Sequence, residues 1–193
     1  MYTIRENNTY ELEIKKSKFI SKIYKVNSIE EINTILTNIK KEYNDATHCC
    51  YAYIINDHKK SSDDGEPGGT AGIPILQVLD KSNLNYVLCV VIRYFGGIKL
   101  GAGGLVRAYT KSVSELIKET PIVELIKGYK IEITITYEDQ KQLDYILKNY
   151  KYEKTYQSNI IYQILIPKEE LVNLNNYNPT IIEEIEIEKE SVI

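Results

Sequence analysis

The run YVLCVVIRYF, residues 86–95, is the most apolar segment of the chain. An apolar run of this kind, rich in β-branched residues, is typical of a strand that is covered on both faces. A glycine-rich segment, residues 96–104, follows it, and residues 105–118 have the apolar spacing of an amphipathic helix. The first part of the chain is therefore predicted to fold around this strand.

Upstream of the central strand the sequence alternates between strand and helix patterns. A capping box formed by Ser28 and Glu31 predicts a helix that begins after Ser28. Residues 57–72 are polar and rich in glycine, and they predict a loop that is long enough to be functional or mobile. Alternation predicts strands at residues 9–15, 19–26 and 46–55, and a short helix is expected at residues 73–79.

The last third of the chain has a different pattern and a different charge. Strands are predicted at residues 130–137, 152–157, 160–166 and 181–187, with helices at residues 139–149 and 167–174. This β-α-β-β-α-β order is that of a ferredoxin-like domain. Residues 1–127 carry 17 basic and 15 acidic side chains, whereas residues 128–193 carry 7 and 12. We therefore predict an α+β protein with two domains, residues 1–127 and 128–193.

Composition excludes several classes of protein. The 193 residues are 43% hydrophobic and 26% charged, which is ordinary for a globular chain, and no apolar run approaches the ~20 residues of a membrane span. The first residues lack the pattern of a signal peptide, and three cysteines make neither a disulfide framework nor a metal-binding spacing. We expect a cytoplasmic protein with no membrane segment and no disulfide-linked partner. A net charge of −3 means that any contact with nucleic acid needs a local basic patch.

The second glycine-rich segment leaves a strand and opens a helix, an arrangement that suits an anion. Glycine lets backbone N–H groups approach a ligand closely, and a helix N-terminus adds partial positive charge. The predicted anion-binding set is Arg93, Gly96, Gly97, Lys99, Gly101, Gly103, Gly104 and Arg107. Val106 stands where the dinucleotide fingerprint needs glycine, and no Walker sequence is present. The alternative that these glycines only make turns and close packing stays open.

The first glycine-rich loop carries three carboxylates, Asp63, Asp64 and Glu66. Their spacing does not match a calcium loop, so we favour turn acids or helix caps over a metal site. Asp63 or Asp64 is also placed to pair with a basic residue of the second loop. His48 and the neighbouring serines form no nucleophile elbow, so no catalytic residue and no cofactor are predicted.

Four runs of residues together resemble the IMPACT family, in its bacterial YigZ-like branch. They are residues 16–20 (KSKFI), 45–53 (DATHCCYAY), 62–72 (SDDGEPGGTAG) and 93–107 (RYFGGIKLGAGGLVR). The resemblance covers about residues 1–120 strongly and extends to the acidic second domain. The sequence departs from the family pattern at Cys49 and Gly68, which weakens any chemical role for those two positions.

The resemblance implies a fold and a role in translation. The first domain is expected to be a β/α sandwich of the kind found in ribosomal and elongation-factor domains, and the second a ferredoxin-like domain. The pair then resembles the fourth and fifth domains of elongation factor G. Eukaryotic relatives regulate translation under amino-acid starvation, a stress response. The residues implied to line the family's shared cleft are His48, Asp63, Asp64, Glu66, Arg93, Lys99 and Arg107.

Two functions follow as hypotheses. The first is a non-enzymatic regulator of translation that binds RNA, the ribosome or a translation-related protein through the second glycine loop. The alternative is an enzyme or small-ligand site for a phosphorylated metabolite or nucleotide, with Mg²⁺ held by the acids. The absence of a complete catalytic motif favours the first.

Overall fold

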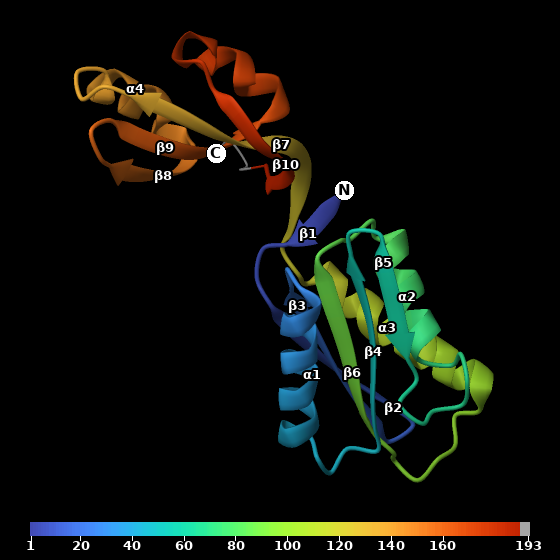
Figure 1. The fold of residues 1–193 in the computed structure, drawn as a ribbon. Coiled ribbons are helices and arrows are strands. Elements are labelled where there is room, and N and C mark those ends of the chain that lie inside the picture. Colours follow the sequence, from blue (N-terminus) through green and yellow to red (C-terminus); the bar gives the residue numbers. More distant parts are fainter. Residues whose placement is uncertain (190–193) are drawn as a thin grey trace. The chain divides into compact units, whose positions relative to one another are not determined.

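The computed structural model describes residues 1–189, which form two compact units, Met1–Val123 (unit 1) and Glu124 onward (unit 2). The sequence predicts a division at Gly128, and the two units divide a few residues earlier, after Val123. Among residues 1–189, no helix has both the length and the apolar character that crossing a bilayer requires. The fold is α+β in both units (Figure 1).

Unit 1 is built on one antiparallel sheet with the strand order β2-β3-β6-β4-β5. The predicted central strand is β6 (Val87–Tyr94), which is buried along almost its whole length and lies in the middle of the sheet. The other elements of unit 1 are β1 (Tyr2–Ile4), β2 (Asn8–Ile14), β3 (Ser17–Lys25), α1 (Ile29–Glu42), β4 (His48–Ile55), β5 (His58–Ser62), α2 (Gly72–Lys81) and α3 (Ala102–Lys118).

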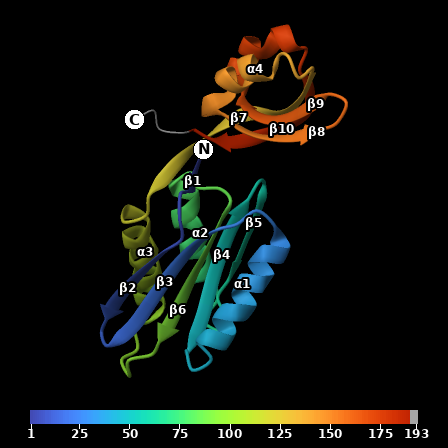
Figure 2. The same cartoon turned by 90° about the vertical axis from the view of Figure 1, so that its left-hand side faces the viewer.

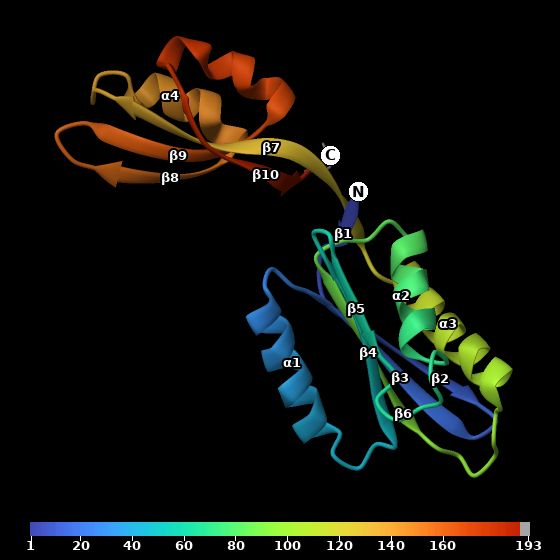
Figure 3. The same cartoon turned by 45° about the vertical axis from the view of Figure 1, so that its right-hand side comes forward.

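Helices cover both faces of this sheet, with α1 on one side and α2 and α3 on the other (Figure 3). Alternate residues of β6 therefore enter two separate cores: Leu88 and Val90 lie under α1, while Val87 and Cys89 pack with α2 and α3. Burial on both faces explains why the strand has no polar alternation. The Ser28 hydroxyl accepts the Glu31 N–H at 3.1 Å at the start of α1, and the Glu31 carboxylate accepts the Asn27 N–H at 2.8 Å. The predicted pair, Ser28 and Glu31, therefore caps this end of the helix.

The prediction of a long loop at residues 57–72 is partly wrong, because β5 occupies His58–Ser62. This strand pairs with β4 at the edge of the sheet, and Asn56 enters the connecting turn with a φ of 51°. Its lysines and serines give no apolar alternation, which is common for an edge strand. The true loop runs only from Asp63 to Ala71.

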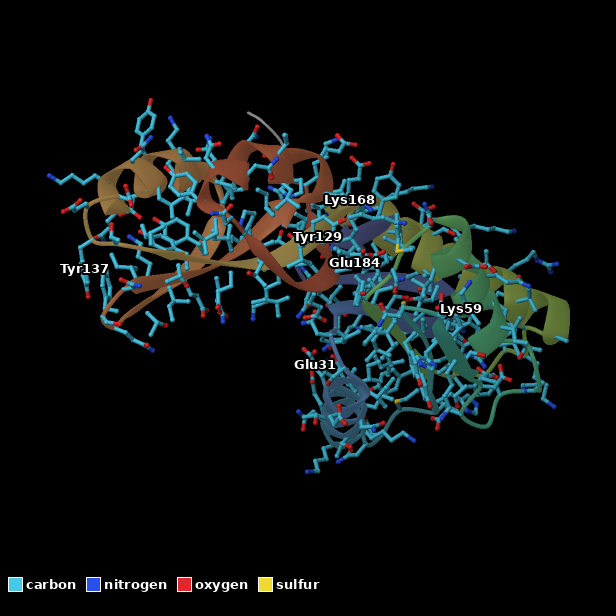
Figure 4. The ribbon with its side chains drawn as sticks, turned by 45° about the horizontal axis from the view of Figure 1, so that its top comes forward. Glu31, Lys59, Tyr129, Tyr137, Lys168 and Glu184 are labelled. Carbon is cyan, nitrogen blue, oxygen red and sulfur yellow. The ribbon has the colours of Figure 1, made fainter. Side chains whose placement is uncertain are left out.

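Unit 2 has the strand order β10-β7-β9-β8, with every neighbouring pair antiparallel (Figure 2). This order and the two intervening helical segments make it ferredoxin-like, as predicted. Its elements are β7 (Ile122–Ile135), which begins in unit 1, α4 (Gln140–Ile146), η1 (Leu147–Asn149), β8 (Lys151–Tyr156), β9 (Ile160–Pro167), η2 (Lys168–Tyr177) and β10 (Thr180–Glu188). On the helix-covered face, Lys168 Nζ lies 5.6 Å from the centre of the Tyr129 ring, beside Glu184 (Figure 4).

Candidate functional site

Both glycine-rich loops leave the sheet of unit 1 at the same end. The register pairs Lys18 with Tyr94, His48 with Arg93 and Tyr51 with Ser62. The end of β6 therefore lies beside the start of β3 and the start of β4, and β5 ends at the same end of the sheet (Figure 1). We call residues 63–71 the acidic loop, and residues 95–107, which include the first turns of α3, the basic loop.

A buried ion pair joins the acidic loop to the central strand. Arg93 Nη1 donates to Glu66 Oε1 at 2.6 Å, and the Tyr109 hydroxyl of α3 donates to the same oxygen at 2.8 Å. Arg93 is 5% exposed and Glu66 is 7% exposed. A buried charge needs a partner, since leaving one alone in a protein interior is strongly unfavourable. Glu66 and Arg93 therefore fix one loop against the sheet.

This arrangement corrects two predictions. Arg93 belongs to the predicted anion-binding set, yet its guanidinium is buried and faces Glu66, so it cannot reach a ligand on the outside of the loop. The expected pairing of Asp63 or Asp64 with the second loop is also wrong. Glu66 makes that connection instead, because its side chain turns inward between β6 and α3.

Asp63 caps the start of α2. Its carboxylate accepts the N–H groups of Gly69, Ala71 and Gly72 at 2.8–2.9 Å. Burial on its own would raise the pKa of the Asp63 carboxyl, but the three backbone donors outweigh it and the pKa lies below the ordinary value of 3.8. The interpretation of these acids as helix caps fits Asp63.

This cap makes the stability of unit 1 depend on pH. Because the folded-state pKa is depressed, the cap stabilises fully above about pH 4 and is lost as pH falls through the lower folded-state value. We expect Asp63→Asn to lower the free energy of unfolding by about 1 kcal/mol at neutral pH, and by much less near pH 3. Urea unfolding at both pH values measures this, with the exposed Asp57→Asn as control. An equal loss at both pH values would contradict the capping role.

Asp64 and His48 tie the acidic loop to β4. Asp64 Oδ2 accepts the Cys49 N–H at 2.8 Å, and Lys40 Nζ lies 3.2 Å from Asp64 Oδ1. His48 Nδ1 lies 2.9 Å from the Asp64 carbonyl oxygen, which can only accept, so Nδ1 carries a proton. His48 Nε2 is 3.8 Å from Glu66 Oε2. Four of the seven residues implied to line the cleft, His48, Asp63, Asp64 and Glu66, therefore lie together and bond within the protein.

The buried thiol of Cys50 lies beside this network. The pKa of the Cys50 thiol is raised to about 12, mainly by burial. The hydrogen bond with Tyr109 opposes this shift, and the nearby carboxylates of Glu66, Asp64 and Asp63 add to it. The thiol therefore stays protonated at neutral pH.

The acidic loop does not provide a set of free carboxylates for a cation. Asp63 holds backbone N–H groups, Asp64 holds Lys40 and Cys49, and Glu66 holds Arg93 and Tyr109. Over residues 1–189, no group of three His, Cys, Asp or Glu side chains is placed to hold a metal ion. The Mg²⁺ part of the alternative hypothesis thus finds no donor set here.

The basic loop presents its charges outward. Lys99 and Arg107 are exposed, and within residues 1–189 neither forms an ion pair. Gly101 caps α3 with a φ of 70° and has no side chain to accept the first N–H groups of the helix. The first intrahelical bond is Leu105 N–H to Gly101 O, so three earlier amides stay open to solvent or a ligand. An added Cβ at Gly103 would lie 3.5 Å from Arg107 Nη1, which places this guanidinium over the same first turn.

Glycine is needed at different positions of this loop for different structural reasons. A Cβ at Gly96 would lie 2.0 Å from the backbone of Lys16, because the turn between β2 and β3 packs directly on it. Gly97 and Gly101 have φ values of 82° and 70°, which only glycine adopts without strain. Close packing and turn geometry account for these three, whereas Gly103 and Gly104 lie in α3.

Alanine at two of these positions should have opposite effects. Gly96→Ala forces backbone away from backbone, and we expect unit 1 to lose about 3 kcal/mol or more. Gly103→Ala lies in a helix with ordinary contacts and should stabilise by about 0.5 kcal/mol. Thermal unfolding of both variants beside wild type measures the difference. Similar stabilities for the two would mean that Gly96 is not packed as described.

Sequence reasoning missed Tyr109 and Ser17. The Tyr109 hydroxyl bonds to Glu66, and Ser17 Oγ accepts the Gly96 N–H at 3.2 Å. A signal existed for Tyr109, because it lies on the buried stripe of the helix with Leu105 and Val113, where a hydroxyl needs a partner. Nothing in the sequence pairs Ser17 with a loop so distant along the chain.

The comparisons with known proteins identify the family of this chain. The fold and site define a two-domain α+β protein whose first unit has a charged, internally paired loop beside an exposed basic loop. The Impact N-terminal domain matches residues 15–117, so the chain belongs to the IMPACT family. It also resembles members of the bacterial YigZ-like branch, as the sequence motifs indicate.

The chain is similar to "IMPACT family member YvyE" of Bacillus subtilis, with 51% identity over 126 residues, 64% of this chain and 58% of that protein. It is similar to "IMPACT family member YigZ" of Escherichia coli, with 39% identity, 58% of this chain and 60% of that protein. Each alignment thus spans less than two thirds of the relative's own length. A crystal structure described as a hypothetical protein matches at a TM-score of 0.64 and 27% identity, over 93% of this chain and 95% of that one.

Proposed function

We propose that this protein regulates translation without catalysing a reaction, and that it binds RNA of the translation machinery through its basic loop. The observation that carries the proposal is a contrast at one end of unit 1. The three acids of the acidic loop are engaged within the protein, whereas Lys99 and Arg107 are exposed and unpaired. Positive charge at this end is therefore not cancelled, despite the net charge of −3.

The binding chemistry that we propose is phosphate recognition. The guanidinium of Arg107 and the ammonium of Lys99 attract phosphate, and the open N–H groups at the start of α3 donate to its oxygens. The translational role is carried over from the family that the motifs resemble, whose eukaryotic members are expected to regulate translation. Stress response and contact with the ribosome are parts of the same proposal.

Fluorescence anisotropy with a labelled single-stranded RNA tests the binding. We expect the affinity to fall as salt rises from about 50 to about 200 mM, with a log–log slope of about −0.7 for each phosphate contacted. Absence of binding, or binding that does not respond to salt, would contradict the proposal. A nucleotide that raised the melting temperature where RNA did not bind would favour the small-ligand alternative.

A further inference from the structure

The exposed aromatic side chain of the basic loop carries an inference that rests on the proposed function and makes it more specific. Phe95 is 46% exposed although it follows the most buried strand of unit 1. Its backbone is fixed, since the Phe95 N–H donates to Thr47 Oγ1 at 3.0 Å. The ring thus lies at the surface directly after the end of β6.

The Arg93 guanidinium lies over the Phe95 ring. The Arg93 guanidinium carbon lies 5.7 Å from the centre of the Phe95 ring and 5.5 Å from the centre of the buried Phe19 ring. Arg93 is itself fixed by Glu66. A cation over a ring face is attracted to the ring, so Arg93 holds one side of Phe95 and leaves the exposed part of the ring as a platform.

Unpaired cations surround this platform. The turn between β2 and β3 packs on Gly96 and brings the exposed Lys15 and Lys16 beside the basic loop. Neither lysine forms an ion pair in the described part of the chain, and Lys99 lies in the same loop as Phe95. An aromatic face between cations complements a nucleotide that has a free base and a charged backbone.

We propose that Phe95 stacks on an unpaired base of single-stranded RNA, while Lys16 and Lys99 contact the neighbouring phosphates. A duplex hides the faces of its bases, so the site discriminates single strands from duplexes. The alternative ligand for this site is an acidic protein segment, which supplies negative charge but has no nucleobase to stack on Phe95.

The absence of tryptophan from this chain gives a direct test. Phe95→Trp places one fluorophore on the platform, and Tyr145→Trp, at a site 74% exposed in unit 2, is the matched control. We expect an oligoadenylate of about 10 nucleotides to quench the tryptophan of Phe95→Trp only. A blunt RNA duplex and polyglutamate should leave both signals unchanged. Phe95→Ala should weaken oligoadenylate binding about tenfold, measured by anisotropy.

The outcomes separate the two proposals. Salt-sensitive binding of oligoadenylate without quenching of Phe95→Trp would overturn the stacking inference and leave the proposed function standing. Equal quenching by polyglutamate would also overturn it, in favour of an acidic protein partner. No binding of any RNA by the wild-type protein would overturn both.

Discussion

Glu66→Ala should be among the most destabilising single substitutions in unit 1. It removes the partner of a buried arginine and the acceptor of the Tyr109 hydroxyl. An unpaired charge left in a protein interior costs about 3–5 kcal/mol, a large part of a typical total of about 5–15 kcal/mol. Arg93 Nε already has no hydrogen-bond partner, so losing Glu66 would leave the buried guanidinium with few polar contacts. Thermal and urea unfolding measure the effect.

A double variant separates charge from packing. Replacing both partners by apolar residues, Glu66→Leu with Arg93→Met, removes the isolated charge and should recover most of the stability. The exposed Glu6→Ala serves as a control of equal chemistry. If Glu66→Ala stayed within about 1 kcal/mol of wild type, the ion pair would not be what holds the acidic loop to the sheet. Binding experiments should avoid single Arg93 variants, because a loss of binding would then report on folding.

Lys99→Gln combined with Arg107→Gln should have the second large effect, on binding rather than on stability. Two charge-assisted contacts of about 1.5 kcal/mol each are worth about 100-fold in affinity. Loss of two phosphate contacts should also make the log–log salt slope shallower by about 1.4. Both side chains are exposed and unpaired, so the free energy of unfolding should change by less than about 0.5 kcal/mol.

The matched control is Lys81→Gln combined with Lys118→Gln. These lysines lie in the last turns of α2 and α3, away from the basic loop, and their loss changes the net charge by the same amount. RNA affinity should fall by far less than in the Lys99 and Arg107 variant. Equal losses in the two variants would show that binding follows net charge and not the basic loop.

Much of the fold follows from the sequence because its signals are local. The apolar run at residues 86–95 predicts the central strand, and the strand and helix order of the second part predicts the ferredoxin-like unit. The edge strand β5 is the exception. Its pairing with β4 depends on a tight turn at Asn56, and its exposed lysines carry no apolar pattern.

The site is less predictable, because its chemistry depends on which charges are buried. The sequence places Arg93 with Lys99 and Arg107 as three equivalent cations of one segment. Strand alternation does not single out Arg93, since β6 is covered on both faces and its residues from Val87 to Arg93 are all buried. Only the tertiary structure shows that Glu66 forms an ion pair with Arg93, whereas Lys99 and Arg107 form none in the described residues.

Co-sedimentation with ribosomes measures whether the basic loop binds the translation machinery. Wild type and the Lys99→Gln, Arg107→Gln variant would be centrifuged with purified ribosomes at low and at high salt. We expect wild type to pellet with ribosomes at low salt only, and the variant to stay in the supernatant at both salt concentrations while remaining folded. A variant that pellets as wild type does, or a wild-type protein that never pellets, would contradict it.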